Sequence, residues 1–287
     1  MQAKTIKRIG ILRGGTGKHY YSSLQKGGEI IFHISENLAD KYKVFDILVD
    51  KDYIWHLNGV PILPADLAQK VDVVWNTSHP SFSNILESLS IPNISAGAFS
   101  SALENSREFL REHIKQIGLS MPRYLVSPKN SREVFEKFGA PWIVKILNEI
   151  KIVKTFDELT EIINGKKNVI VEEFIPGKIA SVHSVPKFRD QDIYIFPLGN
   201  SFGIFSVEEK EKLANMAKIL HKHLGAKHYL KSDFVLTPRG KIHLLQIDGM
   251  PDLKPNSHFS QVAESVGAKM SDVVEHILEQ TFLRYLL

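Results

Sequence analysis

Two apolar segments joined by a short polar turn, residues 231–248, restrict the fold of this chain more than any other feature of the sequence. Strand-like residues on either side of a Pro-Arg-Gly turn at 237–240 predict a β-hairpin. Antiparallel pairing then brings Asp233 near Gln246 and Asp248, because residues flanking a short turn lie opposite one another. Two carboxylates and one amide suit Mg²⁺, which prefers oxygen ligands. Acids at strand ends are also common turn and cap residues, so a solvated hairpin edge is the alternative.

The composition is ordinary for a globular protein, with 43% hydrophobic and 24% charged residues among 287. That length allows two or three domains. No apolar run reaches the roughly 18 residues that span a bilayer, and the amino terminus lacks an apolar signal core. We therefore expect a cytoplasmic protein without a membrane partner. The absence of cysteine excludes disulfides, thiolate metal sites and a cysteine nucleophile.

The chain is basic, with a net charge of +4 and a pI of about 9.0. Nucleic acid is one partner that such a charge could suit, but the lysines and arginines are scattered and not clustered with aromatic residues. An anionic small molecule such as a nucleotide accounts for the charge equally well. We expect no nucleic-acid partner.

Three successive segments differ in their pattern of strands and helices. Residues 1–97 alternate short apolar strands with helices, which predicts an α/β domain with a parallel sheet. Residues 98–176 and 177–287 each mix strands and helices, which we expect to form a central and a carboxy-terminal domain. Besides the hairpin, the expected strands are 6–12, 44–49, 71–75, 142–147 and 169–174 and two more early in the last segment; the expected helices are 22–38, 83–89, 107–117, 131–138, 155–164, 207–224, 257–266 and 270–285.

A glycine-rich turn, residues 13–18, follows the first expected strand and opens a helix. Backbone amides in such a turn can meet an anion or a carboxylate. Glycines at this position also serve tight packing alone, and we leave both interpretations open. The turn is not a P-loop, since the Gly-Lys-Ser/Thr spacing is missing.

Lys145 lies inside the apolar strand 142–147, where a charge needs a partner or a ligand. The Lys145 side chain points either into a cleft or to the solvent-exposed face of a strand whose side chains alternate between the two faces of the sheet. Glu172 and Glu173 end a later strand that continues through Phe174 and Ile175 into a Pro-Gly corner. A glutamate beside exposed backbone can bind an adenine by accepting a hydrogen bond from its amino group. Paired acids at strand ends, however, usually only face solvent. A lysine strand, a glutamate strand and an Asp/Gln/Asp hairpin, in that order, predict an ATP site.

In these motifs the chain resembles the ATP-grasp superfamily, and within it the D-alanine–D-alanine ligases, over nearly its whole length. The resembling elements are Gly14-Gly15-Thr16, residues 92–97 with Ser101-Ala-Leu103, the Lys145 strand, residues 172–177, the Asp233 strand and residues 251–257. The resemblance implies an ATP-grasp fold with an amino-terminal α/β, parallel-sheet (pre-ATP-grasp) domain followed by central and carboxy-terminal α+β domains. It also implies ATP between the last two domains, and a homodimer. It also implies a cell-wall (peptidoglycan) reaction, in which ATP phosphorylates the carboxylate of one D-alanine and a second amino acid attacks the acylphosphate.

The resemblance also implies a role for each matching residue. Lys145 would hold the α- and β-phosphates of ATP, and Arg107 stands where the family has a phosphate-contacting lysine. Ser257 would meet the substrate carboxylate. The adenine would lie against Glu172 and the backbone of Glu173, Phe174 and Ile175, and Mg²⁺ would be held by Asp233, Gln246 and Asp248.

Several of these positions depart from the family pattern. Gln246 stands in place of a metal-bridging glutamate, and Lys231 replaces the arginine that steadies the tetrahedral intermediate. His19 replaces the glutamate that receives the first substrate's ammonium, and Lys178 replaces an acid at the ribose. The loop after the Lys145 strand is shortened to Asn148-Glu-Ile150, the loop before residue 207 is nearly absent, and Asn76-Thr-Ser-His79-Pro-Ser replaces a glycine-rich, acidic segment.

Two hypotheses follow. The chain is an ATP-dependent carboxylate–amine ligase, with reduced activity or a substrate other than D-alanine. Alternatively it is a non-catalytic relative that serves as a nucleotide-binding or regulatory module, because phosphoryl transfer needs loops that close the site and exclude water.

Overall fold

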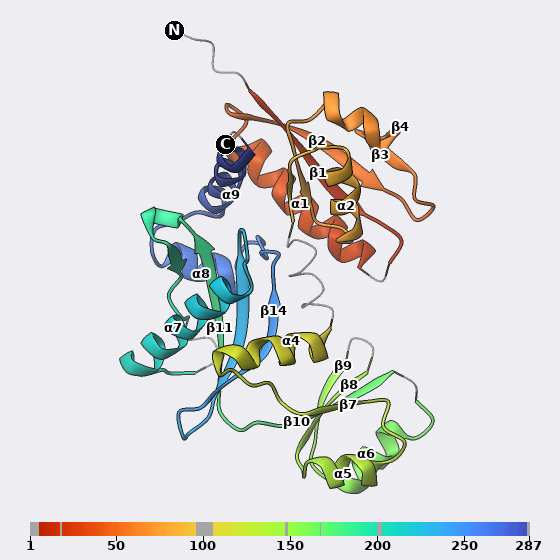
Figure 1. Ribbon diagram of the computed structural model, residues 1–287, viewed down its shortest axis with the longest axis vertical. Coiled ribbons are helices and arrows are strands. Elements are labelled where there is room, and N and C mark those ends of the chain that lie inside the picture. The colour runs from red at the N-terminus through yellow and green to blue at the C-terminus, as the bar shows by residue number, and fades with distance from the viewer. Residues whose placement is uncertain are drawn as a thin grey trace.

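The computed structural model describes residues 6–17, 19–95, 106–146, 149–166, 168–199 and 203–285. These residues form three sheets that follow one another along the chain (Figure 1). In Figure 1 the first sheet lies at the top, the second at the bottom and the third between them. Three parts of the sequence singled out above lie outside the described residues, namely residues 18, 96–105 and 147–148.

The first sheet contains β1 (Lys7–Gly14), β2 (Tyr42–Val49), β3 (Trp55–Leu57), β4 (Val60–Ile62), β5 (Val73–Asn76) and β6 (Asn93–Ile94), in the order β4-β3-β2-β1-β5-β6. The pairs among β2, β1, β5 and β6 are parallel, as predicted, whereas β3 and β4 add an antiparallel edge. Ile9 and Ile11 of β1 pack with α1 (Tyr20–Asn37), and Leu12 packs with α2 (Ser81–Ser88). A central parallel strand is covered on both faces in this way.

The second sheet contains β7 (Tyr124–Val126), β8 (Trp142–Ile146), β9 (Glu149–Val153) and β10 (Val169–Glu173), all antiparallel in the order β7-β10-β8-β9. One core joins this sheet to α5 (Ser131–Lys137) and α6 (Phe156–Ile163). The last register pair of β8 and β9 is Ile146 with Glu149, so only two residues separate the strands. The connection after the Lys145 strand is therefore short, as expected, but Glu149 and Ile150, which were expected in the loop, belong to β9.

The third sheet contains β11 (Lys178–Pro186), β12 (Ile193–Ile195), β13 (Leu230–Leu236) and β14 (Ile242–Asp248), all antiparallel in the order β12-β11-β13-β14. A core shared with α4 (Arg107–Ile114) and α7 (Val207–His223) covers this sheet. The strands β13 and β14 are the predicted hairpin, and its turn is closed by a hydrogen bond from Gly240 N to Thr237 O of 2.8 Å. Gly240 has a φ of 73°, a conformation that glycine adopts without strain.

The first and third sheets share one hydrophobic core. It contains α1, strands β1 and β5, residues of the third sheet, and the last two helices, α8 (His258–Glu264) and α9 (Met270–Tyr285). Figure 1 shows α9 beside α1, at the same end of the molecule as the first sheet. This core brings the amino end of α1 close to the end of β14. Among the described helices, none is long and apolar enough to cross a membrane.

Candidate functional site

Asp233 on β13 lies at the centre of a hydrogen-bonded group on the third sheet and is only 7% exposed. Ser181 of β11 donates its hydroxyl to Oδ1 at 2.5 Å, and Gln246 of β14 donates its amide N–H to Oδ2 at 2.6 Å. Lys231 Nζ lies 3.1 Å from the same Oδ2. An ionised carboxylate only accepts hydrogen bonds, so the Gln246 amide must turn its NH₂ group toward it. Two neutral donors and one ammonium therefore surround this carboxylate.

A β-bulge produces this arrangement. Phe234 pairs with Leu244, but Asp233 pairs with Gln246, so the register shifts between the two positions. A one-residue shift turns following side chains to the other face of the sheet. The bulge therefore puts Gln246 on the same face as Asp233. The sequence prediction that these two side chains lie close together is confirmed, and their role as metal ligands stays a prediction.

Asp248 ends β14 at the first sheet. It is the register partner of Lys231. Its Oδ1 accepts the backbone N–H of Met250 at 2.8 Å, and its Oδ2 lies 3.3 Å from Lys26 Nζ of α1. Lys26 was not among the residues predicted from the sequence. No local signal marks it, because its partner is 222 residues away along the chain.

Glu172 on β10 is 4% exposed and lies between two cations. Lys145 Nζ is 2.9 Å from Oε1, and Arg107 Nη2 is 3.2 Å from Oε2. Lys145 pairs in register with Ile170, so Glu172 is its diagonal neighbour on the adjacent strand. The sequence left open whether Lys145 faces water or a partner. In the structure Lys145 pairs with the buried carboxylate of Glu172.

Three buried atoms of this group have no hydrogen-bond partner among the described residues: Nε and Nη2 of Arg107 and Oε1 of Glu172. The ion pairs bring Nη2 and Oε1 to contact distance without hydrogen-bond geometry. Buried polar atoms are rarely left in this state unless a ligand or water completes them. The group is therefore suited to a ligand that offers both donors and acceptors.

Arg107, the first residue of α4, connects the second and third sheets. Its Nη1 lies 3.4 Å from the carbonyl oxygen of Leu245, which directly precedes Gln246. The side chain that pairs with Glu172 thus also touches the hairpin that carries Asp233. The two groups meet at one junction between the sheets.

The backbone after Glu172 is partly engaged within the protein. Glu173 N–H donates to Arg123 O at 2.8 Å, and its carboxylate forms an ion pair with Arg123 at 2.8 Å, which lowers the pKa of Glu173. Phe174 N–H donates to Pro141 O at 3.3 Å. These contacts hold the segment that includes Ile175 beside the sheet. Its predicted contact with adenine stays a prediction.

His19 and Ser257 both lie at helix amino ends. His19 is the residue before α1 and makes no side-chain cap, and it lines a cavity. The Ser257 hydroxyl accepts the N–H of Ser260 at 3.1 Å and donates to Asp252 O at 3.0 Å. Ser257 therefore caps α8 in this structure. Its expected contact with a substrate carboxylate stays a prediction.

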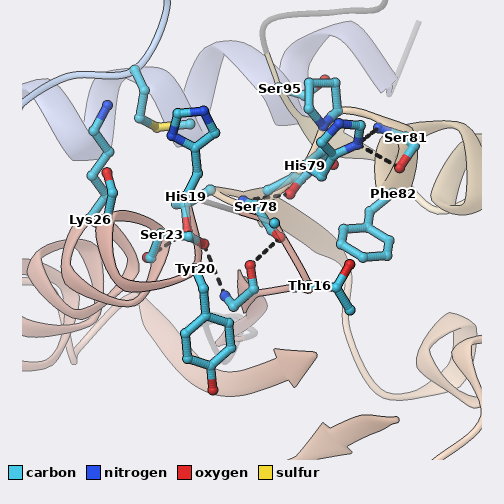
Figure 2. Close-up of a pocket in the computed structure, with 18 of the residues that line it drawn as sticks. Thr16, His19, Tyr20, Ser23, Lys26, Ser78, His79, Ser81, Phe82 and Ser95 are labelled. Carbon is cyan, nitrogen blue, oxygen red and sulfur yellow. Dashed lines mark hydrogen bonds between the residues drawn. The ribbon is translucent and has the colours of Figure 1, made fainter. Parts of the chain in front are cut away.

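A cavity of about 620 Å³ lies between the first sheet and the end of β14. Its walls come from the glycine-rich turn, the first turns of α1, residues 76–82 and residues 248–250 (Figure 2). Gly14 and Gly15 have φ values of 90° and 96°, and a Cβ on Gly14 would lie 2.2 Å from Val49 O. Tight packing therefore requires glycine at position 14, in agreement with one of the two interpretations of the glycine-rich turn. A second cavity of about 200 Å³ shares Ser22, Lys26, Asp248 and Met250 with the first.

The second cavity is bordered by three aromatic side chains that sequence reasoning missed. Tyr229 Oη lies 2.6 Å from His183 Nδ1, and His183 Nε2 lies 2.8 Å from His258 Nδ1. Burial, with smaller effects from His258 and Lys231, holds the pKa of His183 well below its usual range. Burial raises the pKa of Tyr229 well above its usual range. The neutral tyrosine can donate to His183, which then donates to His258 and fixes the proton positions of the row.

Replacing Tyr229 by Phe is expected to lower the free energy of unfolding by about 1 to 3 kcal/mol, because Nδ1 of the buried His183 loses its partner. Urea unfolding followed by circular dichroism measures the change. Tyr194→Phe is the matched control, since Tyr194 is also buried in the third sheet but lies outside this row. Equal effects of the two substitutions would show that the row contributes no special stability.

The donors expected for Mg²⁺ suit it in chemical type. Asp233 and Asp248 are carboxylates on one hairpin, and Gln246 between them offers an amide oxygen if its side chain rotates. Lys231 and Lys26, which lie beside the two carboxylates, would have to move aside. In the part of the chain that the structure describes, no group of three or more histidine and acidic side chains is close enough to hold a metal ion.

Comparisons with known proteins agree with this fold. A family model described as D-ala D-ala ligase C-terminus matches residues 198–279. The D-alanine–D-alanine ligase of Geotalea uraniireducens is 24% identical in an alignment that covers 97% of this chain and 96% of that protein. That of Pelagibacter ubique is 25% identical, covering 95% and 97%.

Two solved structures superpose over almost the whole chain. D-alanyl-alanine synthetase A from Vibrio cholerae gives a TM-score of 0.79 at 18% identity and covers 98% of this chain and 99% of that one. The D-alanine–D-alanine ligase from Bacillus anthracis complexed with ATP gives 0.73 at 21% identity, covering 96% and 97%. The expected ATP-grasp fold with an amino-terminal parallel-sheet domain is confirmed.

Proposed function

We propose that this chain, an ATP-grasp protein that resembles the D-alanine–D-alanine ligases over nearly its whole length, is an ATP-dependent carboxylate–amine ligase. The observation that carries the proposal is the position of Arg107, which touches both Glu172 and the hairpin of Asp233. Groups that suit a base, a phosphate and a cation therefore meet at one junction. The buried polar atoms without partners at Arg107 and Glu172 support a ligand in this place.

In this proposal the nucleotide lies between the second sheet and the hairpin. Glu172 Oε1 accepts an N–H from the amino group of adenine. Lys145 and Arg107 turn toward the phosphates, which compete with Glu172 for their positive charge. The short pairs in the structure keep these cations in place before the nucleotide arrives.

Asp233, Gln246 and Asp248 would hold Mg²⁺, which supplies positive charge next to the transferred phosphoryl group. The residues of the chain bind and orient the two substrates. The acid occupies the larger cavity, and the amine approaches through the smaller one, which Lys231 lines. Lys231 offers one positive charge to the oxyanion that forms when the amine attacks. The homodimer that the resemblance implies and the cytoplasmic location expected from the sequence stay predictions.

A non-catalytic, nucleotide-binding or regulatory role is the second candidate. The observation that favours it is the pairing of each anion of the site with a cation of the same chain: Glu172 with Lys145, Asp233 with Lys231 and Asp248 with Lys26. Breaking these pairs costs free energy before any metal binds. The two-residue connection between β8 and β9 also leaves little chain to cover bound phosphates.

One assay separates the two candidates. The chain is incubated with ATP, Mg²⁺ and a panel of amino acids and carboxylic acids, and ADP release is measured beside nucleotide binding by calorimetry. Release that requires both an acid and an amine supports the ligase. Binding of ATP without release under every combination supports the regulatory module, and absence of ATP binding refutes both.

Replacing Lys145 by Ala is expected to weaken ATP binding by about 1 to 3 kcal/mol, because a charge-assisted contact with the phosphates is lost from a partly enclosed site. Calorimetric titration with ATP measures this change. Lys137→Ala on α5 is the control, since Lys137 is an exposed lysine on a helix that packs against the second sheet. An unchanged affinity for the Lys145 variant would show that the lysine serves only its pair with Glu172.

A further inference from the structure

The larger cavity has room for an acid much larger than alanine. The cavity offers about 620 Å³, which lies within the usual range for sites of much larger ligands. Apolar walls are provided by Tyr20, Tyr53, Phe82 and Met250, so that part of the ligand can be a carbon chain.

The polar groups of this cavity suit anions. Lys26 is the lysine of its described lining, and His19 and His79 are the imidazoles (Figure 2). In Figure 2 Lys26 and His19 lie on one side of the cavity and His79 lies on the other. His79 Nδ1 accepts the N–H of Ser81 at 3.2 Å, which places the proton of the neutral ring on Nε2. That nitrogen is then a donor, as an anion requires.

Lys26 has the position that a recognition residue needs. It lines both cavities, and its side chain is 27% exposed. Its contact with Asp248 Oδ2, at 3.3 Å, is longer than a strong ion pair and leaves two of its ammonium hydrogens for a ligand. Asp248 also places Lys26 beside the hairpin proposed to hold Mg²⁺. An acid bound to Lys26 therefore lies next to the phosphate-transfer site.

The same lining is poorly matched to an α-ammonium group. Among the described residues of the wall, Asp248 is the acid, and its two oxygens already face Lys26 and the Met250 N–H. An ammonium ion placed there would lie beside Lys26, and like charges at short range repel. The pair of Lys26 and Asp248 thus favours an anionic ligand group over a cationic one.

We infer that the acid accepted by this cavity is a larger molecule with two or more carboxylates, and that Lys26 is the residue that selects it by binding one of them. The inference rests on the proposed ligase function for the role of the acid, but the binding event needs no nucleotide. The second carboxylate remains for activation. The imidazole of His79 contributes a donor from the opposite side of the cavity.

The test is calorimetric titration of the full chain, without nucleotide, with glutarate, citrate and D-alanine. At least one polycarboxylate is expected to bind 10-fold or more tightly than D-alanine. Lys26→Met should weaken that binding by about 10- to 100-fold, as expected for a lost charge-assisted contact, and Lys26→Arg should retain most of it. Lys218→Met, which removes an exposed lysine of α7, should have no effect.

Two results would overturn the inference: D-alanine binding as tightly as both polycarboxylates, or equal polycarboxylate affinity in the Lys26→Met variant and the unmodified chain. Circular dichroism of the variants excludes loss of folding as the cause. ADP release with the same acids separates this inference from the proposed function. If polycarboxylate binding depends on Lys26 but no acid causes ADP release, the inference is supported and the ligase function is refuted. If D-alanine causes as much ADP release as the polycarboxylates, and does so equally in the Lys26→Met variant, the ligase function is supported and the inference is refuted.

Discussion

D-alanine ligation by this chain is expected to be at least about 10²- to 10³-fold slower than by the D-alanine–D-alanine ligase from Geotalea uraniireducens in the same assay. Lys231 offers a point charge where the resemblance expects the two aligned N–H donors of an arginine. Part of that charge is already compensated by Asp233 at 3.1 Å. Loss of one aligned donor to a developing oxyanion alone has an effect of this size.

Two further features act in the same direction. Gln246 carries a neutral amide, so this side chain adds no negative charge to a metal site, and its NH₂ group faces Asp233 at 2.6 Å. The connection between β8 and β9 is only two residues long, which is shorter than the resemblance implies, so we expect water to reach an acylphosphate more readily. These effects concern one transition state and need not add simply.

The measurement is dipeptide formation from D-alanine, ATP and Mg²⁺, followed by mass spectrometry beside ADP release. The single substitutions Gln246→Glu and Lys231→Arg are not expected to restore the rate, because neither supplies the missing cover over the phosphates. Rapid dipeptide synthesis by the unmodified chain would show that its short connections close the site after all.

Acidification from pH 7 to pH 4 is expected to lower the free energy of unfolding of the third sheet by several kcal/mol through its buried histidines. Burial lowers the pKa of His221 to about 4. Burial, with a smaller effect of the neighbouring Arg284, lowers the pKa of His228 to about 3. His183 shifts in the same direction for the same first cause.

The sign follows from proton uptake. Below pH 6.5 these histidines become protonated in the unfolded chain while the folded chain keeps them neutral, so acid favours unfolding. Each contributes about 1.4 kcal/mol per pH unit between its unfolded and folded pKa values. Glu29 has the opposite effect on the free energy of unfolding. Burial and the neighbouring Asp252 raise its pKa in the folded chain, so its protonation in acid favours folding.

Urea unfolding at pH values between 8 and 4, followed by circular dichroism, measures the dependence. His228→Gln should reduce the slope by about one proton, because the amide oxygen can still accept from Arg284 but cannot be protonated. His79→Gln is the control, since His79 is exposed. A free energy of unfolding that is equal at pH 7 and pH 5 would contradict the prediction.

Most of the fold was predictable from local pattern. The apolar runs of β1, β5, β8 and β10, the long helices and the hairpin at 231–248 all appear with ends within a few residues of the expected ones. The missed strands, β3, β4, β6, β7 and β9, are short or lie at sheet edges. Glu149–Val153 was interpreted partly as a loop, yet it pairs with β8 along its whole length. Tertiary pairing decides such weak patterns.

The site was predictable only in part. The hairpin turn was enough to predict that Asp233 and Gln246 lie near each other, but the β-bulge that places them directly opposite was not foreseen. Lys145 and Glu172 were identified separately, as a charge in an apolar strand and an acid at a strand end, but their contact was not foreseen. Lys26, His183 and Tyr229 were missed, since each meets its partners through residues distant in the chain.

The sequence by itself determined the long helices, the longer strands, the hairpin and the types of side chain available for an ATP site, because those follow from periodicity and turn chemistry within a few residues. Only the tertiary structure decided what each charge meets. It brought Lys26 from α1 to Asp248, Arg107 from α4 to both Glu172 and the hairpin, and His183 between Tyr229 and His258. Such contacts depend on how separate sheets and helices pack, and electrostatic interactions act across space without regard to separation along the chain.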